Sequence, residues 1–286
     1  MKKCLFFLIL VLLVAGCKKK EESLAPIHVQ INDFTVTQEN ITRDEVPIVD
    51  YTGVKAITLA FYEGTTEAYK TTQFRADAST YTTFGSFDCA LRIGSYTMVV
   101  LAYGSEYEIT LTSPTSAAYT ADKCRETFAY TQTVNVSTTA AINLGATLDR
   151  VISKVKVQST DIQVPEAKTV NVSFSAGGIS FDPTTGLATS NTGFTNEITI
   201  GAPSGGTSNF ASYIFLASDE QTVTVTIDIL DEDDATLYHK EVNNVPLKRN
   251  RMTVLSGQLF SSSSSGQFLV ESGWEGGDDL YIDIDP

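Results

Sequence analysis

Short runs of alternating apolar and polar residues recur along almost the whole chain after residue 17, and a 3.6-residue apolar period is hard to find. Alternation places every second side chain on one face of an extended strand, so this pattern predicts β-structure. The clearest case is a hairpin in which Thr222–Leu230 and Thr236–Val242 flank the polar turn Asp231–Asp234. The chain is therefore predicted to be all-β.

Many further runs have strand character and are separated by turn residues. The predicted strands are His28–Val36, Val54–Tyr62, Ser95–Tyr103, Glu106–Leu111, Thr131–Val136, Lys154–Gln158, Thr169–Phe174, Asn196–Ile200, Ser212–Leu216, Thr222–Leu230, Thr236–Val242, Met252–Phe260, Gln267–Val270 and Leu280–Ile284. So many short strands in 286 residues favour two antiparallel β-sandwich domains over one barrel. We predict an N-terminal sandwich over residues 27–148 and a C-terminal sandwich over 149–286.

The first sixteen residues have the features of a signal peptide, with Lys2 and Lys3 before the apolar run Leu5–Val14. This run is too short for a membrane span. It leads into Val14-Ala15-Gly16-Cys17, which resembles the lipobox of bacterial lipoproteins, where cleavage leaves a lipidated cysteine at the new N-terminus. Residues 1–16 are thus a predicted lipoprotein signal peptide and Cys17 is the predicted lipid attachment site.

Residues 17–26 form a predicted lipidated tether. Its run of three lysines followed by Glu21 and Glu22 resembles the signal that exports lipoproteins of Bacteroidales-type bacteria to the outer face of the outer membrane, although a plain charged linker explains it equally well. We expect the protein in the cell outer membrane, anchored by N-terminal acyl chains such as palmitate and exposed at the surface.

Two cysteines remain in the predicted body of the protein. Cys4 leaves with the signal peptide and Cys17 carries lipid, so Cys89 and Cys124 are left as a pair outside the cytoplasm. Such a pair predicts a disulfide that closes a loop of about 35 residues and stabilises the fold by roughly 3–4 kcal/mol. Two separate buried thiols are the alternative.

Charge and composition exclude several classes of function. The 34 acidic residues outnumber the 20 basic ones, which gives a net charge of −14 and makes nucleic acid a poor partner. Only two histidines are present, and His28 and His239 both lie on predicted strands, where solvated side chains are the expected reading. Neither a catalytic residue nor a metal site is predicted.

Three local features have both a functional and a structural reading. Asp231–Asp234 could bind calcium, but it lacks the spacing of an EF-hand loop and fits a solvated hairpin tip better. Trp274 lies in a loop-like segment, where packing over a sandwich end is commoner than stacking on a sugar. The many carboxylates leave a glycosidase pair open, but no particular pair is marked out.

Two segments, together with the lipobox, the tether and the β-rich halves, resemble the Bacteroidales-type fimbrillin superfamily, including its fimbrial anchor and minor-subunit lipoproteins. These are Leu148–Val155, which opens the second half, and Asn244–Gly257 near the end. Gly94-Ser95-Tyr96 also resembles the start of a central strand in immunoglobulin-like and transthyretin-like sandwiches. The resemblance implies two transthyretin-like sandwiches and a non-enzymatic role in surface fimbriae and adhesion, with no cofactor.

Assembly by strand exchange is what the resemblance further implies. In that family an Arg-specific protease removes the first strand of a lipidated precursor, and a terminal strand of another subunit fills the groove. The matching first strand here is His28–Val36, the candidate cleavage site is Arg43, and the candidate donor is Leu280–Ile284. Arg43 can equally be an exposed loop arginine, and anchor-type members keep their lipid and their first strand.

The expected partners are other fimbrial subunits, outer-membrane lipid and a host or bacterial surface receptor. A surface glycan-binding lipoprotein is the alternative function, because such proteins share the anchor and the stacked β-sandwiches. A hydrolase would need a cleft with paired carboxylates.

Overall fold

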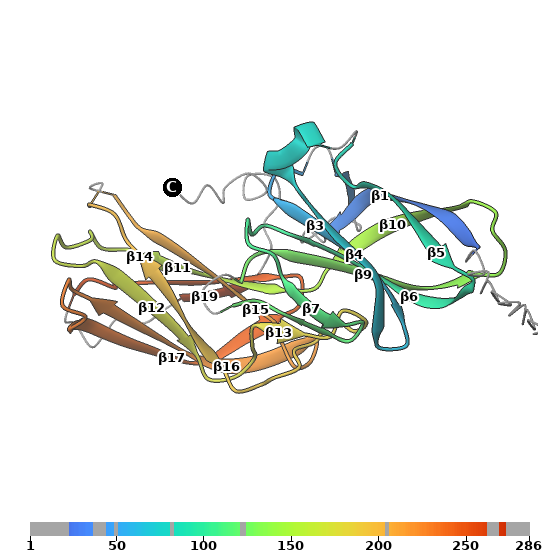
Figure 1. The fold of residues 1–286 in the computed structure, drawn as a ribbon. Helices are drawn as coiled ribbons and strands as arrows, with labels where there is room; N and C mark the ends of the chain where they lie inside the picture. The colour runs from blue at the N-terminus through green and yellow to red at the C-terminus, as the bar shows by residue number, and fades with distance from the viewer. Residues whose placement is uncertain are drawn as a thin grey trace, which may run out of the picture.

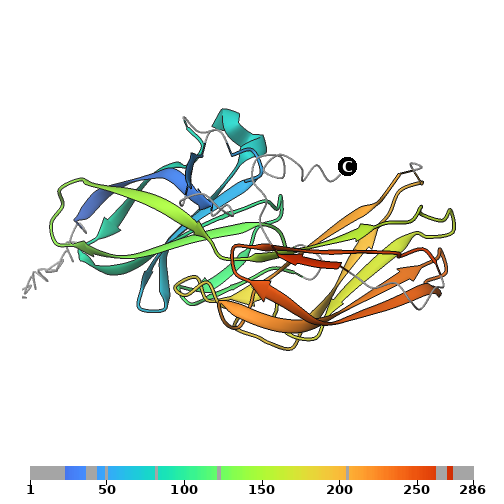
Figure 2. The same cartoon turned by 180° about the vertical axis from the view of Figure 1, so that it is seen from behind.

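The computed structural model describes residues 23–36, 44–48, 51–80, 83–120, 124–203, 206–261 and 269–272. Within these ranges it holds strands and one short 3-10 helix, η1 (Arg75–Thr80), and no α-helix, which confirms the all-β prediction. Figures 1 and 2 show the strands gathered in two groups, the N-terminal half ending with β10 and the C-terminal half beginning with β11. No helix in the described ranges is long and apolar enough to span a membrane.

The N-terminal half is built on one large sheet. Its strands are β1 (Leu24–Val36), β2 (Asp44–Pro47), β3 (Ala56–Glu63), β4 (Thr66–Phe74), β5 (Ser86–Arg92), β6 (Gly94–Tyr103), β9 (Thr127–Val136) and β10 (Ile142–Arg150). They follow the order β2-β1-β10-β9-β6-β3-β4, and β5 pairs with β1. Side chains from β1, β3, β5, β6, β9 and β10 meet in one apolar cluster, so the sheet curves around its own core.

The C-terminal half is a sandwich of two four-stranded sheets. Its strands are β11 (Ser153–Ser159), β12 (Thr169–Phe174), β14 (Phe194–Thr199), β15 (Asn209–Ile214), β16 (Glu220–Leu230), β17 (Thr236–Lys248), β18 (Met252–Gly257) and β19 (Leu269–Ser272). The sheets β15-β11-β18-β19 and β14-β12-β16-β17 enclose a second apolar cluster between them. The predicted hairpin is confirmed as β16 and β17, with Val223, Val225, Ile227 and Ile229 buried.

The two halves share a third sheet and a third core. The hairpin of β7 (Thr110–Ser113) and β8 (Ser116–Ala118) pairs with β13 (Ser180–Phe181) of the C-terminal half. Beneath this sheet a cluster takes buried side chains from both halves, and the rings of Phe181 and Phe215 stack 4.1 Å apart. The halves are therefore joined by backbone hydrogen bonds and by packed apolar side chains.

Some strand predictions need correction. The predicted strand Glu106–Leu111 is wrong in its first part, because β7 begins at Thr110 and Tyr107 is an exposed residue before it. The predicted strand His28–Val36 begins earlier, at Leu24. The predicted division after residue 148 falls inside β10, and the predicted strand Leu280–Ile284 lies outside the described residues.

Gly193 is a position where the fold requires a glycine. Its φ is +72°, and a Cβ there would clash with the carbonyl oxygen of Phe174. We expect Gly193→Ala to lower the free energy of unfolding by about 2 kcal/mol or more, through left-handed strain and a clash with backbone. Urea denaturation measures this. Gly201→Ala, where a Cβ would meet no atom within 4 Å, is the control and should change stability by less than about 0.5 kcal/mol.

Candidate functional site

The first strand is inserted between neighbours on both sides. β1 runs parallel to β10, from Ile27 opposite Ile142 to Thr35 opposite Asp149. Its other edge pairs antiparallel with β5 along its first part and with β2 along its last part. A strand at the start of the described chain thus occupies an interior position in the sheet.

The inward face of β1 is apolar along its whole length. Ala25, Ile27, Val29 and Ile31 alternate and are each at most 1% exposed. The pairing with β10 then shifts by one residue between Ile31 and Asp33, so that Phe34 takes the next core position. Burial of a large apolar side chain stabilises a fold by roughly 1.5–3 kcal/mol, so Ile27, Val29, Ile31 and Phe34 bind β1 firmly in its slot.

The Phe34 ring completes this slot at its far end. It packs 4.7 Å from the ring of Phe128 on β9 and 5.6 Å from the ring of Tyr51. Tyr51 lies beyond β2 in the chain, so the residues that follow β1 contribute part of the wall around its last apolar side chain.

A buried ion pair lies next to these aromatic rings. Arg150 Nε is 2.7 Å from Glu126 Oε1, and the Arg150 side chain is completely buried. Tyr51 donates its hydroxyl proton to Glu126 Oε2 at 2.6 Å and accepts from Arg150 Nη2 at 3.2 Å. Arg150 Nη1 donates to Asn250 Oδ1 of the C-terminal half at 3.1 Å. We call Tyr51, Glu126, Arg150 and Asn250 the junction cluster.

Arg150 keeps its charge within the junction cluster. Burial lowers the pKa of Arg150, but the Glu126 carboxylate and Tyr51 raise it by more, so the guanidinium stays protonated. Burial, reinforced by the charge of Glu126, raises the pKa of Tyr51 well above its usual range, so its hydroxyl remains a donor. The cluster therefore joins β10, the residue before β9 and the turn between β17 and β18 by charge-assisted contacts.

The residues after β2 also make contacts that do not involve β1. Arg75 donates from Nε to the carbonyl oxygen of Val54 at 2.7 Å, and from Nη2 to those of Tyr51 and Ile48 at 3.1 and 3.2 Å. Tyr51 is held a second time through the junction cluster. The chain beyond Ile48 is thus fastened to the body by contacts that do not involve β1.

Several predicted site residues lie outside the described ranges. These are Cys17, Arg43, Trp274 and the candidate donor Leu280–Ile284. Arg43 directly precedes β2 in the sequence, and Cys17 stands six residues before Ser23, the first described residue. Sequence reasoning identified β1 from its alternation but missed the junction cluster, whose members lie far apart in the chain.

Both histidines pair with aspartates across neighbouring strands. His28 Nδ1 is 2.8 Å from Asp88 Oδ1 on the outer face of β1 and β5, and His239 Nδ1 is 2.6 Å from Asp228 Oδ1 on β17 and β16. The Asp231 carboxylate of the predicted calcium candidate accepts the backbone N–H groups of Asp233 and Ala235 and so shapes the hairpin tip. Among the described residues there is no group of three metal-ligating side chains.

The structure corrects the predicted disulfide, because Cys89 and Cys124 are both free thiols. Cys89, on β5, packs against the core of the N-terminal half, whereas Cys124 is buried in the cluster shared by the two halves. The alternative of two separate thiols therefore holds. Burial, followed by the charge of Asp88, raises the pKa of Cys89 to about 11, and burial also raises the pKa of Cys124 well above its usual range.

These thiols should be unreactive in the folded protein. A thiolate is the nucleophile, so at neutral pH we expect slow alkylation of Cys89 and slower alkylation of Cys124. The rate at Cys89 should rise toward pH 11, as its thiol ionises. In the mature protein, which would lack Cys4 and carry lipid on Cys17, denaturation without reductant should expose both thiols, and intact mass should then show two added alkyl groups. If alkyl groups were added only after a reductant, Cys89 and Cys124 would be joined by a disulfide as first predicted.

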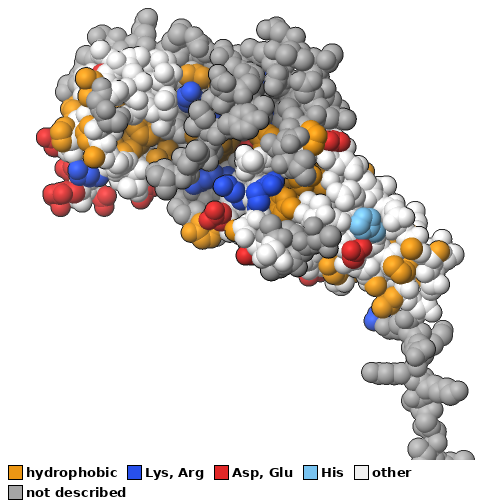
Figure 3. Space-filling model, turned by 90° about the horizontal axis from the view of Figure 1, so that it is seen from above, with side chains coloured by type: hydrophobic (Ala, Val, Ile, Leu, Met, Phe, Trp, Pro, Cys, Tyr) orange, Lys and Arg blue, Asp and Glu red, His pale blue; other side chains and the backbone are white. Residues whose placement is uncertain are grey.

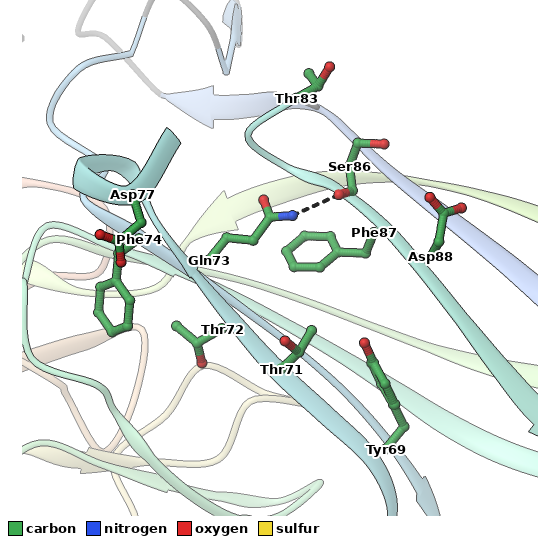
Figure 4. Close-up of a pocket in the computed structure, with 10 residues that line it drawn as sticks. All are labelled: Tyr69, Thr71, Thr72, Gln73, Phe74, Asp77, Thr83, Ser86, Phe87 and Asp88. Atoms are coloured by element: carbon green, nitrogen blue, oxygen red, sulfur yellow. Dashed lines mark hydrogen bonds between the residues drawn. The ribbon is translucent and has the colours of Figure 1, made fainter. Parts of the chain in front are cut away.

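A hollow of about 450 Å³ opens between β4 and β5. Figure 4 shows Tyr69 and Thr71 from β4 on one side of it and Phe87 and Asp88 from β5 on the other. At one end Gln73 bridges the strands, since its Nε2 donates to the carbonyl oxygen of Ser86 at 2.7 Å. The hollow has polar groups and aromatic rings, and it lies beside β5, the strand that also borders β1.

Comparisons with known proteins give a family and a fold. Residues 64–283 match the profile of a family of unknown function, DUF6562, and no curated protein matches the chain. A proposed adhesin from Bacteroides ovatus superposes with a TM-score of 0.50 at 9% identity, over 86% of this chain and 96% of that one.

Two fimbrial structures from Porphyromonas gingivalis are also similar. The fimbrial anchor protein Mfa2 has a TM-score of 0.43 at 13% identity, over 87% of this chain and 97% of that one. A fimbrilin, FimA, has a TM-score of 0.44 at 12% identity, over 87% and 96%. The superposition on the Bacteroides ovatus protein confirms, for the fold, the resemblance that the sequence led us to expect. Because the matched profile covers most of its length, the chain belongs to the DUF6562 family.

Proposed function

We propose that this protein is a non-enzymatic, lipid-anchored surface protein that serves as a fimbrial anchor or accessory subunit and joins other subunits by β-strand addition. The observation that carries the proposal is β1, an apolar strand bonded on both edges near the start of the chain. Its neighbours β10 and β5 would border an empty slot if it left. Backbone bonds and alternating pockets in such a slot are what strand addition requires.

The two ends of the chain fit this proposal. Cys17 would carry the lipid that holds the protein in the outer membrane, and the halves would act as two sandwich units over residues 27–148 and 149–286. The segment Leu280–Ile284 repeats the spacing of the β1 core positions, with Leu280, Ile282 and Ile284 every second residue. A donor strand of this pattern would present three apolar side chains to the slot of another subunit.

Cleavage or retention of the bond after Arg43 distinguishes two modes of action. Cleavage there would release β1, while the chain beyond Ile48 would stay fastened through Arg75 and the junction cluster. An uncut chain would keep β1 and act as a permanent anchor. Intact mass and N-terminal analysis of the protein from its native membrane decide between a start at lipidated Cys17 and a start at Asp44.

Strand exchange is tested with the cut protein and a synthetic β1 peptide. An Arg-specific protease is applied to the chain, with Arg43→Gln as the uncleavable control, and a labelled peptide of residues 24–36 is added. We expect the peptide to replace its cleaved counterpart in a complex detected by native mass spectrometry. A peptide with Val29→Asn and Ile31→Asn should fail to bind, and one with His28→Asn and Asn32→Ser on the outer face should bind. Equal binding of both variants would contradict the proposal.

Glycan binding is a second candidate function, favoured by the hollow between β4 and β5. Its volume suits a small saccharide, and Tyr69, Thr71 and Asp88 provide a ring, a hydroxyl and a carboxylate. On a glycan panel, Tyr69→Ala should abolish any binding, while Tyr107→Ala, at an exposed tyrosine outside the hollow, should preserve it. If the wild-type protein bound no glycan on the panel, this function would be excluded.

A further inference from the structure

Three segments meet at the end of the N-terminal half where the described chain begins. In the strand registers, Leu24 lies opposite Arg92, Gly94 lies opposite Val136, and Ile27 pairs with Ile142. The start of β1, the turn Arg92–Gly94 and the loop Ser137–Ala141 therefore share one tip of the molecule. We call these three segments the tether end.

The tether end exposes apolar side chains, and its three segments contain no acidic residue. Leu24 is 48% and Ile93 57% exposed, and they are two of the four exposed large apolar residues in the described chain. Ala140 and Ala141 are also exposed. Arg92 is the one charged residue of these segments, in a chain with 34 acidic residues. Figure 3 shows apolar side chains with a basic group at this end of the body.

The fold holds Ile93 in its outward position. The Tyr96 hydroxyl donates to the carbonyl oxygen of Arg92 at 3.0 Å across the turn, and the Tyr96 side chain is itself buried. A Cβ on Gly94 would lie 3.2 Å from the Tyr96 hydroxyl oxygen, so a glycine lets the ring cover the turn. The exposed side chain of Ile93 thus extends from a turn that Tyr96 holds in place.

The chain length before Leu24 sets how far this tip can stand from a lipid on Cys17. Seven residue steps separate Cys17 from Leu24, and a fully extended chain spans at most about 25 Å over that number. A protein held by acyl chains at Cys17 would therefore keep its tether end close to the headgroups at all times. Even a weak surface contact is favoured at the high effective concentration that such a tether imposes.

We propose that the tether end docks on the membrane that carries the lipid anchor, with Leu24 and Ile93 in the interfacial layer and Arg92 among the headgroups. The proposal rests on lipidation of Cys17. Apolar side chains beside basic groups are the composition that binds bilayer interfaces, and a second contact strengthens a lipid anchor. The contact would stand the N-terminal half end-on and direct the C-terminal half away from the membrane.

The test places a fluorophore at the tip of the lipidated full-length protein. Ile93→Cys labelled with bimane is compared with Ile162→Cys, an exposed site in the C-terminal half. At neutral pH we expect the native thiols to react much more slowly than the exposed Cys at position 93 or 162, because burial raises the pKa of Cys89 and Cys124 is buried. Both proteins are reconstituted in vesicles of phosphatidylethanolamine and phosphatidylglycerol that carry nitroxide-labelled acyl chains. We expect the nitroxide to quench most of the fluorescence at position 93 and little at position 162.

Flotation of the vesicles separates the two ways in which the test can fail. If the protein floats with the vesicles but position 93 is not quenched, the anchor holds and the docked tip is overturned. If the lipidation proposal fails, the protein stays in the dense fraction, and the docked tip falls with it. A second variant set uses bimane at Ser137→Cys. Adding Leu24→Glu and Ile93→Glu should abolish quenching there without loss of flotation, and persistent quenching would overturn the proposal.

Discussion

Arg150→Met is expected to lower the free energy of unfolding by about 3–5 kcal/mol, because it leaves the Glu126 carboxylate buried without its partner. The substitution also removes the hydrogen bond to Asn250, which links the halves. Urea denaturation, monitored by the circular dichroism of the backbone, measures the change. Lys70→Met, which breaks the more exposed ion pair with Glu67, should cost less than about 1 kcal/mol.

A second substitution checks the cause of this loss. Glu126→Gln in the Arg150→Met background removes the uncompensated charge, so it should recover part of the lost stability. The single variant Glu126→Gln should be destabilised as well, because it leaves the buried guanidinium unpaired. If Arg150→Met cost no more than Lys70→Met, the junction cluster would not be a buried ion pair.

Val29→Asp should be the most damaging single change in β1, with an expected loss of about 4 kcal/mol or more. The position is completely buried among apolar side chains, so the carboxylate must be desolvated, protonated or expelled with the strand. Asn32→Asp introduces the same group on the exposed outer face of the same strand and should change stability by less than about 0.5 kcal/mol. Both are compared by urea denaturation at neutral pH.

The pH dependence of Val29→Asp has a definite sign. A buried carboxyl has a raised pKa in the folded protein, so its ionisation favours unfolding as the pH rises above the ordinary range for aspartate. The variant should therefore gain stability relative to wild type on acidification. Equal stability of Val29→Asp and Asn32→Asp would show that β1 does not fill the core slot.

Strands with one buried face were the elements that could be predicted. The hairpin of β16 and β17 was found because its apolar residues alternate strictly. β4 was missed, since it ends the sheet and most of its side chains are at least partly exposed, which leaves no clean alternation. β10 was also missed, and the predicted boundary after residue 148 falls within it, although Ile142, Leu144, Ala146 and Leu148 do alternate with more exposed residues.

The candidate site was predictable only in part. The alternation of Val29 and Ile31 identified a strand with a buried face, but the parallel pairing with β10 depends on a segment more than a hundred residues away. Arg150 lies in the Leu148–Val155 segment that carries the family resemblance, yet its burial follows from partners on other elements, one of them 99 residues distant. The separation of Cys89 and Cys124 into two cores was equally invisible in the spacing of the cysteines.

The sequence by itself determined that the chain is all-β and which residues of its alternating strands face a core. Both follow from a local rule, because a period of two sets the face of each side chain. Only the tertiary structure decided which strand lies beside which, how β1 is enclosed and which charges are buried together. Side-chain alternation is the same for any neighbour, so strand order is chosen by the combined packing of the whole chain.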